Sequence, residues 1–206
     1  MIAVNILWNE TPTNTGANSG IGYEVAKLFA NTSAVYRVFV CGRTTEKSKQ
    51  AVASIQAQLP PGETYALKLD IINQSSIANA VKEVSSHFDR LDVLINNAGI
   101  QPTSSGLPSQ LRECLETNEI AQSAVTEAFK PLLTKSANPR ILFVSSSVGS
   151  ITLRCDPTNK SYHGSAIAYR TSKTALNMLA ACHAKELKTN SVQKFGPLTR
   201  DWWLRI

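Results

Sequence analysis

Four short runs rich in β-branched and aromatic residues recur along the chain, separated by segments with apolar residues at helical spacing. The runs are YRVFVC (36–41), TYALKLD (64–70), RLDVLIN (90–96) and RILFVSS (140–146). Their length and composition predict β-strands. The apolar faces of two predicted helices carry, respectively, Ile21, Val25, Leu28 and Phe29, and Ile77, Val81, Val84 and Phe88. Strands that alternate with such helices predict right-handed βαβ units and a parallel sheet covered on both faces.

The sequence predicts one α/β domain over residues 1–206. Hydrophobic residues make up 43% of the chain and charged residues 17%, which is typical of ordinary globular proteins. No internal repeat, low-complexity tract or linker divides it. A single doubly wound domain of this length can bury a substantial core.

Composition argues against several classes of function. The net charge is +6, but the Lys and Arg residues are scattered and not interleaved with aromatics, so we expect no nucleic-acid partner. The four cysteines and three histidines lack metal-ligand spacing, so we expect no metal. The start, MIAVNILWNETPT, lacks a basic leader region, and no window reaches the ~20 apolar residues of a membrane span. We therefore expect a cytoplasmic protein with no membrane partner.

A glycine-rich stretch, TGANSGIG (15–22), precedes the first predicted helix. Glycines at such a place allow a tight turn and a close approach of the backbone to a pyrophosphate, and the helix N-terminus offers free N–H groups to the anion. The predicted phosphate contacts are Gly16, Ser19, Gly20, Ile21 and Gly22.

Three further candidates stand where predicted strands end. Arg43 follows the strand VFVCG, at a position where an acidic residue would favour NAD; an arginine can instead pair with the 2′-phosphate of NADP. An exposed loop arginine is the alternative. Asp70 ends the next strand, and Asn97, Ala98 and Gly99 follow the one after it. Open α/β sheets bind ligands at the carboxyl ends of their strands, so these residues are predicted to contact a nucleotide.

The stretch AIAYRTSKTAL (166–176) places Tyr169 and Lys173 four residues apart. Residues at that spacing are neighbours on one face of a helix. The pair alone is equally compatible with a solvated surface.

Taken in order, these features resemble the classical short-chain dehydrogenase/reductase family. The motifs are TGxxxGxG, the strand-end Asp70, NNAG, an Asn in ETN, a Ser in SSSVG, and YxxxK, and they run from Thr15 to about Lys188. The resemblance implies a Rossmann-like doubly wound parallel sheet and an oxidoreductase that interconverts a small-molecule carbonyl compound and an alcohol, with NADP favoured by Arg43. VSSSVGSI and AYRTSK are most similar to the sniffer-like carbonyl reductases.

The same resemblance implies the catalytic roles. Tyr169 is the general acid, and Lys173 stabilises its phenolate and binds the nicotinamide ribose, so that both residues also contact the cofactor. Ser146 polarises the carbonyl oxygen, because the family pattern S-x-x-G places this serine three residues before Gly149; a neighbouring serine is the alternative. Asn118 holds a water in the proton relay.

Two assignments stay open at this point. Lys130 faces the cofactor region in the family, yet a solvated lysine explains it equally well. Residues 153–165, LRCDPTNKSYHGS, are predicted to form a loop between Ser146 and Tyr169, which either shapes a substrate pocket or is a passive surface excursion.

Both ends depart from the family pattern. Loop-like WNETPTN separates the apolar run IAVNIL (2–7) from Thr15, and the final NSVQKFGPLTRDWWLRI (190–206) predicts no further strand or helix. The fold is thus expected to be C-terminally truncated relative to the family, which leaves a catalytically silent nucleotide- or partner-binding protein as the alternative function. The stripe Leu176, Leu179, His183 and Leu187 suits packing either inward or against a second copy in a homodimer or homotetramer.

Overall fold

The computed structural model describes residues 20–160, 162–187, 192–194 and 204–205. Its strands are β1 (Arg37–Gly42), β2 (Glu63–Lys68), β3 (Val93–Asn96), β4 (Arg140–Val144), β5 (Val192–Lys194) and β6 (Leu204–Arg205). Within the described residues β1 and β2 form a two-stranded sheet, and a four-stranded sheet has the order β3-β4-β5-β6. All these pairs are parallel except β5 with β6. The predicted parallel strands are confirmed, and the predicted run 2–7 lies outside the described residues.

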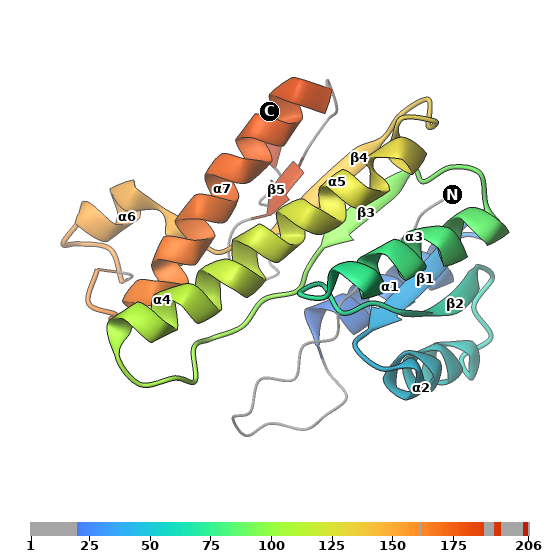
Figure 1. Cartoon of the computed structure of the whole chain (residues 1–206), viewed down its shortest axis with the longest axis horizontal. Helices are drawn as coiled ribbons and strands as arrows, with labels where there is room; N and C mark the ends of the chain where they lie inside the picture. Colours follow the sequence, from blue (N-terminus) through green and yellow to red (C-terminus); the bar gives the residue numbers. More distant parts are fainter. Residues whose placement is uncertain (1–19, 161, 188–191, 195–203, 206) are drawn as a thin grey trace.

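Helices connect the strands (Figure 1). They are α1 (Ile21–Thr32), α2 (Thr45–Gln56), α3 (Gln74–His87), α4 (Leu107–Leu115), α5 (Ala121–Leu133), α6 (Ile151–Cys155) and α7 (Ile167–Leu187), with the π-helical η1 (Glu116–Ile120) and the 3₁₀ turn η2 (Ser147–Gly149). None of the described helices has the length and apolar character needed to cross a lipid bilayer. The order of elements confirms the α/β class.

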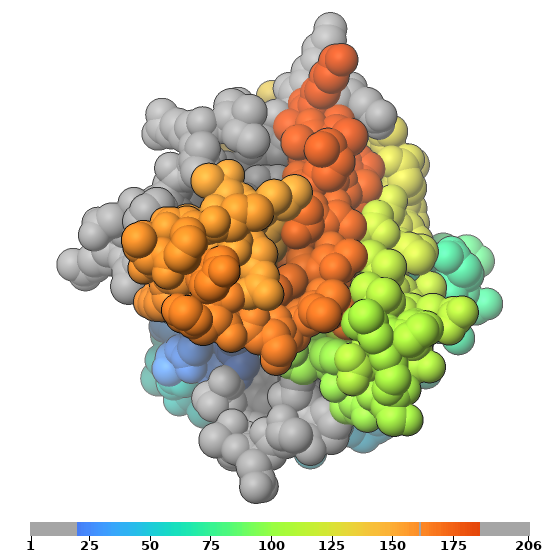
Figure 2. All heavy atoms as spheres, turned by 90° about the vertical axis from the view of Figure 1, so that its left-hand side faces the viewer, coloured from blue at the N-terminus to red at the C-terminus, as the bar shows by residue number. Residues whose placement is uncertain are grey.

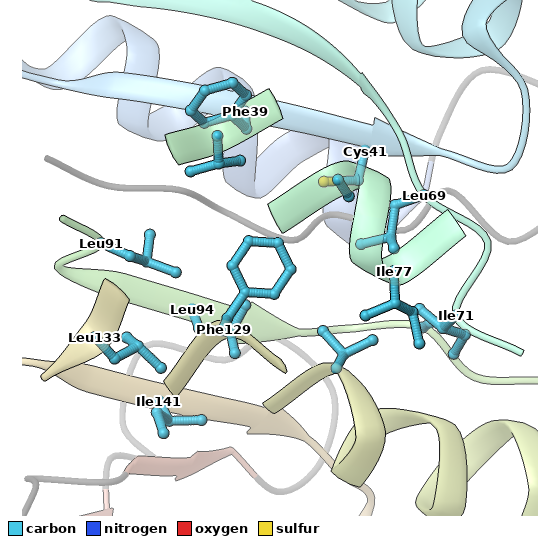
Figure 3. Packing of buried hydrophobic residues seen from close by; sticks show 14 of the residues in the cluster. Phe39, Cys41, Leu69, Ile71, Ile77, Leu91, Leu94, Phe129, Leu133 and Ile141 are labelled. Atoms are coloured by element: carbon cyan, nitrogen blue, oxygen red, sulfur yellow. The ribbon is translucent and has the colours of Figure 1, made fainter. Parts of the chain in front are cut away.

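Alternation along the strands separates two hydrophobic clusters. In β1, Phe39 and Cys41 face one cluster, while Val38 and Val40 face the other. The first cluster takes side chains from α3, α5 and α7, and the second from α1 and α2. Figure 3 shows Ile77 of α3 and Phe129 and Leu133 of α5 in the first cluster. Strand β3 also contributes to both clusters, with Leu94 in the first and Ile95 in the second. Helices therefore cover both faces of one layer of strands, as expected of a Rossmann-like doubly wound fold.

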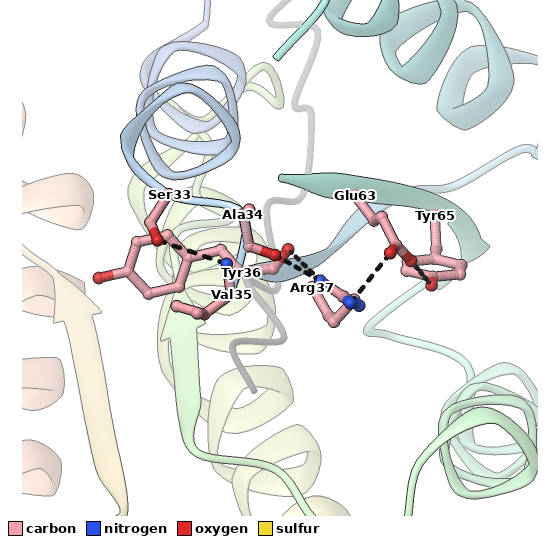
Figure 4. Close-up of polar contacts among 7 residues, drawn as sticks. All are labelled: Ser33, Ala34, Val35, Tyr36, Arg37, Glu63 and Tyr65. Atoms are coloured by element: carbon pink, nitrogen blue, oxygen red, sulfur yellow. Dashed lines mark hydrogen bonds and ion pairs between the residues drawn. The ribbon is translucent and has the colours of Figure 1, made fainter. Parts of the chain in front are cut away.

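The first rung between β1 and β2 carries an ion pair (Figure 4). Arg37 and Glu63 stand opposite each other, and Nη2 of Arg37 lies 3.0 Å from Oε1 of Glu63. The Tyr65 hydroxyl donates to Oε2 of Glu63 at 2.5 Å, and Nη1 of Arg37 donates to the Ala34 carbonyl at 2.8 Å. Because a slip of one residue would turn every side chain to the opposite face, this register determines which residues end at the site.

Three details correct the sequence interpretation. Helix α1 buries Ala26 and Ala30, whereas Ile21 is 49% and Leu28 65% exposed. Val25 and Phe29 are partly buried against the second cluster, so the predicted apolar face is confirmed at these two residues and wrong at Ile21 and Leu28. The chain also continues as strands after α7, because β5 pairs with β4 and supplies the hydrogen bonds that its edge needs. Finally, residues 153–155, predicted as loop, complete the short helix α6.

Candidate active site

Helix α7 carries Tyr169 and Lys173 on one face. The Lys173 Nζ lies 5.7 Å from the centre of the Tyr169 ring. Lys173 is only 3% exposed and Tyr169 is half-buried, so the pair does not decorate a solvated surface. The helix begins directly after Ala166, whose φ of 54° turns the chain sharply, and the Arg170 N–H donates to the Ala166 carbonyl at 3.0 Å. Figure 2 shows α7 between the α6 segment and helices α4 and α5.

Lys173 is held between two backbone segments. Its Nζ donates to the Val144 carbonyl at the end of β4, at 2.9 Å. On another side Gly99 approaches so closely that a Cβ there would lie 3.1 Å from Nζ. Burial lowers the pKa of Lys173 to about 8, while Cys114 is a smaller influence that raises the pKa. The ammonium can therefore lose its proton within an ordinary range of pH.

The proton of Tyr169 is held more firmly than in a free phenol. Burial raises the pKa of Tyr169, and Cys114 adds to the rise. Sequence reasoning expected Lys173 to lower this pKa, but in this geometry burial sets the direction. A tyrosine that stays protonated at neutral pH has the proton that a general acid must give.

Asn118 ties three segments together in the π-helical turn η1. The side chain is fully buried, and its Nδ2 donates to the Ile100 carbonyl at 3.0 Å and to the Ser172 hydroxyl at 2.9 Å. Its Oδ1 accepts from the Ile100 N–H at 2.7 Å. π-Helical turns are frequent at functional sites. This asparagine fixes the segment after β3 against α7, next to Gly99.

The NNAG turn rests on two polar side chains of α5. The Asn96 Nδ2 donates to the Thr126 hydroxyl at 2.9 Å, and the Gln122 Nε2 donates to the Ala98 carbonyl. Sequence reasoning missed Gln122 and Thr126. The available signal was two uncharged polar residues four apart, a spacing that puts both on one face of the helix.

Ser146 and Ser145 have different surroundings. Ser145 points to α7, and its hydroxyl donates to Oδ1 of Asn177 at 2.5 Å. Ser146 begins the turn η2, where its Oγ accepts a long contact from the Val148 N–H at 3.4 Å. The structure thus commits Ser145 to packing and leaves Ser146 as the better candidate of these two.

The predicted nucleotide contacts lie in turns at the ends of elements. Gly20 precedes α1 as an N-cap without a side chain, and Ile21 and Gly22 form the first turn. Arg43 is exposed directly after β1. Asp70 follows β2 by two residues, and its N–H donates to the Ser76 hydroxyl at 2.9 Å. The remaining predicted contacts, Gly16 and Ser19, lie outside the described residues.

Lys130 is not brought to this site. Its Nζ lies 3.5 Å from Oε2 of Glu127, and Oε1 of Glu127 lies 3.8 Å from Nδ1 of His183. His183 is ten residues beyond Lys173, which amounts to about 15 Å along α7. The assignment of Lys130 to the cofactor site is therefore corrected to a surface ion pair.

The segment between α6 and α7 is held by two arginines. Nη1 of Arg154 donates to the Tyr162 carbonyl and, at 2.9 Å, to the Gly164 carbonyl. Nε of Arg170 donates to the Ser165 carbonyl at 2.8 Å. These bonds give the segment a folded backbone beside the start of α7. A contribution of this segment to a substrate pocket stays a prediction.

Comparison with known proteins agrees with this geometry. The sequence model of the short chain dehydrogenase family matches residues 13–195. The short-chain dehydrogenase/reductase tropE of Talaromyces stipitatus is 30% identical over 201 residues, covering 88% of this chain and 74% of the relative. The short-chain dehydrogenase anuI of Penicillium roqueforti is 34% identical over 187 residues, covering 86% and 73%. The chain belongs to the short-chain dehydrogenase/reductase family of oxidoreductases.

Solved structures support the same assignment. The NADPH-bound carbonyl reductase from chicken fatty liver is similar, with a TM-score of 0.73 at 28% identity, covering 93% of this chain and 77% of that chain. A metagenomic short-chain oxidoreductase in complex with NADP has a TM-score of 0.71 at 25% identity, covering 97% and 83%.

Proposed function

We propose that the protein is an NADP-dependent oxidoreductase that interconverts a small carbonyl compound and an alcohol. The observation that carries the proposal is the buried Lys173 ammonium, held by the Val144 carbonyl on the helix face that also carries Tyr169. Burying a lysine ammonium costs stability, and buried ionisable groups with shifted pKa values are concentrated at functional sites.

The described residues fit a nicotinamide nucleotide. A Cβ at Gly99 would also lie 3.3 Å from Oδ1 of Asn118. Glycine at this position therefore leaves room beside the Lys173 ammonium and Asn118. Among the described residues, a Cβ at Gly20 would meet nothing within 4 Å, and the N-terminus of α1 that follows it is suited to a phosphate. We assign the 2′-phosphate to Arg43, which is exposed at the end of β1. The NADP named for two similar structures supports this assignment.

When bound, the nicotinamide supplies or accepts a hydride. The chain supplies the proton: Tyr169 donates it to the carbonyl oxygen, because a phenol whose pKa lies at or above its ordinary value is protonated at neutral pH. The Ser146 hydroxyl donates a hydrogen bond to the same oxygen, where negative charge develops. The Lys173 ammonium stabilises the phenolate that remains, and Asn118 keeps the NNAG segment against α7.

The test is a titration of the purified chain with NADPH and NADH, followed by nicotinamide fluorescence. A panel of ketones and aldehydes is then added, and the loss of the reduced nucleotide is recorded. We expect tighter binding of NADPH and oxidation by at least one carbonyl compound. Binding without turnover across the panel would favour the catalytically silent protein, and absence of binding would overturn the proposal.

A further inference from the structure

Helix α7 also contacts the turn that follows Ser146, at Gly149. Gly149 packs directly on the helix, because a Cβ there would lie 2.8 Å from the Lys173 carbonyl carbon. The Gly149 carbonyl accepts from the Thr174 hydroxyl at 2.9 Å. The turn is thus fastened three residues after Ser146.

Asn177 contacts the chain on both sides of this serine. Its Oδ1 accepts from the Ser145 hydroxyl at 2.5 Å, directly before Ser146. Its Nδ2 donates to the Gly149 carbonyl at 3.4 Å, three residues after Ser146. An amide is suited to this position because it has an acceptor and a donor on one planar group.

The place of Asn177 on α7 links this contact to catalysis. Tyr169, Lys173 and Asn177 follow one another at intervals of four residues, so they lie along one face of the helix. A helix is a rigid spacer, and a group that fastens the serine turn to it also sets the separation between the serine and Tyr169.

The structure assigns to Asn177 the role of a positioning residue, which holds the Ser145 side chain and the Gly149 carbonyl on the two sides of Ser146 and so sets where the Ser146 hydroxyl meets the carbonyl oxygen protonated by Tyr169. The assignment rests on the proposed roles of Ser146 and Tyr169. It concerns placement: Ser145 and Asn177 are both only partly buried, and water can replace their hydrogen bond when one partner is removed.

The kinetic test is a double-mutant cycle in the full chain. Asn177→Ala is expected to lower kcat roughly tenfold without changing the KM for NADPH, because misplaced catalytic groups slow the chemical step. In a Ser146→Ala background the same substitution is expected to cost less than about twofold, since nothing remains to be positioned. An equal loss in both backgrounds would overturn the assignment. Met178→Ala, at a neighbouring position that is 67% exposed, is the matched control and should leave kcat unchanged.

A second measurement does not depend on activity. The Gly149 N–H donates to the Ser146 carbonyl at 3.0 Å, and the Ser150 N–H donates to the Ser147 carbonyl at 3.1 Å. Hydrogen exchange of these amides reports opening of the turn. Exchange should be faster in Asn177→Ala than in Met178→Ala, and equal rates would overturn the assignment. If the wild-type chain reduces no carbonyl compound, the proposed function fails while this measurement still decides the role of Asn177.

Discussion

The two halves of the site present their polar groups in different ways. On the catalytic side, Asn118 is 0% and Lys173 3% exposed, and the described hydrogen bonds tie each of them to the backbone of another element. On the nucleotide side, Arg43 is exposed in the turn after β1. Chemistry requires groups fixed before the substrate arrives, whereas a charged ligand can be met by a side chain that only has to reach it. Substitutions in the two regions should therefore differ in kind.

The largest expected effect is on turnover. Tyr169→Phe removes the hydroxyl that carries the proton and keeps the buried ring, so turnover of a carbonyl substrate should fall roughly 10³-fold. Binding of NADPH, measured by fluorescence titration, should stay within a factor of about two of the wild-type value. A phenylalanine variant that retained wild-type turnover would contradict the role of this residue.

The next effect concerns stability on the catalytic side. Asn118→Ala removes the partner of the partly buried N–H and carbonyl of Ile100, and it removes the buried bond to the Ser172 hydroxyl, which keeps its bond to the Tyr169 carbonyl. We expect the free energy of unfolding to fall by about 3 kcal/mol, measured by urea denaturation. Arg43→Asp, on the exposed nucleotide side, should change it by less than about 0.5 kcal/mol. Equal losses in the two variants would erase the difference between the two regions.

On the nucleotide side the effect should be one of selectivity. Arg43→Asp replaces a guanidinium with a carboxylate that repels a 2′-phosphate and accepts hydrogen bonds from a 2′-hydroxyl. We expect the Kd for NADPH to rise roughly 10- to 100-fold and the Kd for NADH to stay the same or fall. The Kd of Arg43→Lys for NADPH should lie between those of Arg43→Asp and the wild type, because lysine keeps the charge. An equal rise of the Kd for NADPH and for NADH would contradict a role of Arg43 in recognising the 2′-phosphate.

The smallest effect is a dependence on pH. The pKa of Lys173 is lowered to about 8, so its ammonium is present below that pH and is lost as the pH rises through it. If the ammonium is needed, kcat/KM for carbonyl reduction should fall several-fold between about pH 8 and 9. Because burial raises the pKa of Tyr169 from its usual value of 10.0, a decline that began only above pH 10 would point to the tyrosine instead.

The sequence predicted the parts of the fold that depend on local pattern. Strand β1 alternates between two buried faces, and such a strand gives a continuous apolar run that is easy to find. For helix α1 the predicted apolar face was right at Val25 and Phe29 but included the exposed Ile21 and Leu28, because the fully buried residues of this helix are the small Ala26 and Ala30. Strand β5 was missed, because its three residues are stabilised by pairing with β4 and not by their own propensity.

The site followed the same division. Tyr169 and Lys173 could be found from their spacing and family resemblance. Gln122 and Asn177 were missed, because a polar residue in a helix has the same sequence pattern whether it faces water or a backbone carbonyl; the spacing of Gln122 and Thr126 was the one hint. Burial of Lys173 and the resulting fall of its pKa depend on how Gly99 and β4 close around it, which is a property of the assembled structure.

The left-handed backbone at Ala166 bears on how this chain could change over evolution. An L-residue in that conformation costs about 1 kcal/mol, yet here it ends the arginine-held segment and lets α7 begin one residue later. Since the helix start is set locally, the segment before it can be shortened, lengthened or exchanged while Tyr169 stays in its place. The junction is therefore a point at which loops from relatives can be grafted, and such grafts would test the prediction that this segment contributes to a substrate pocket.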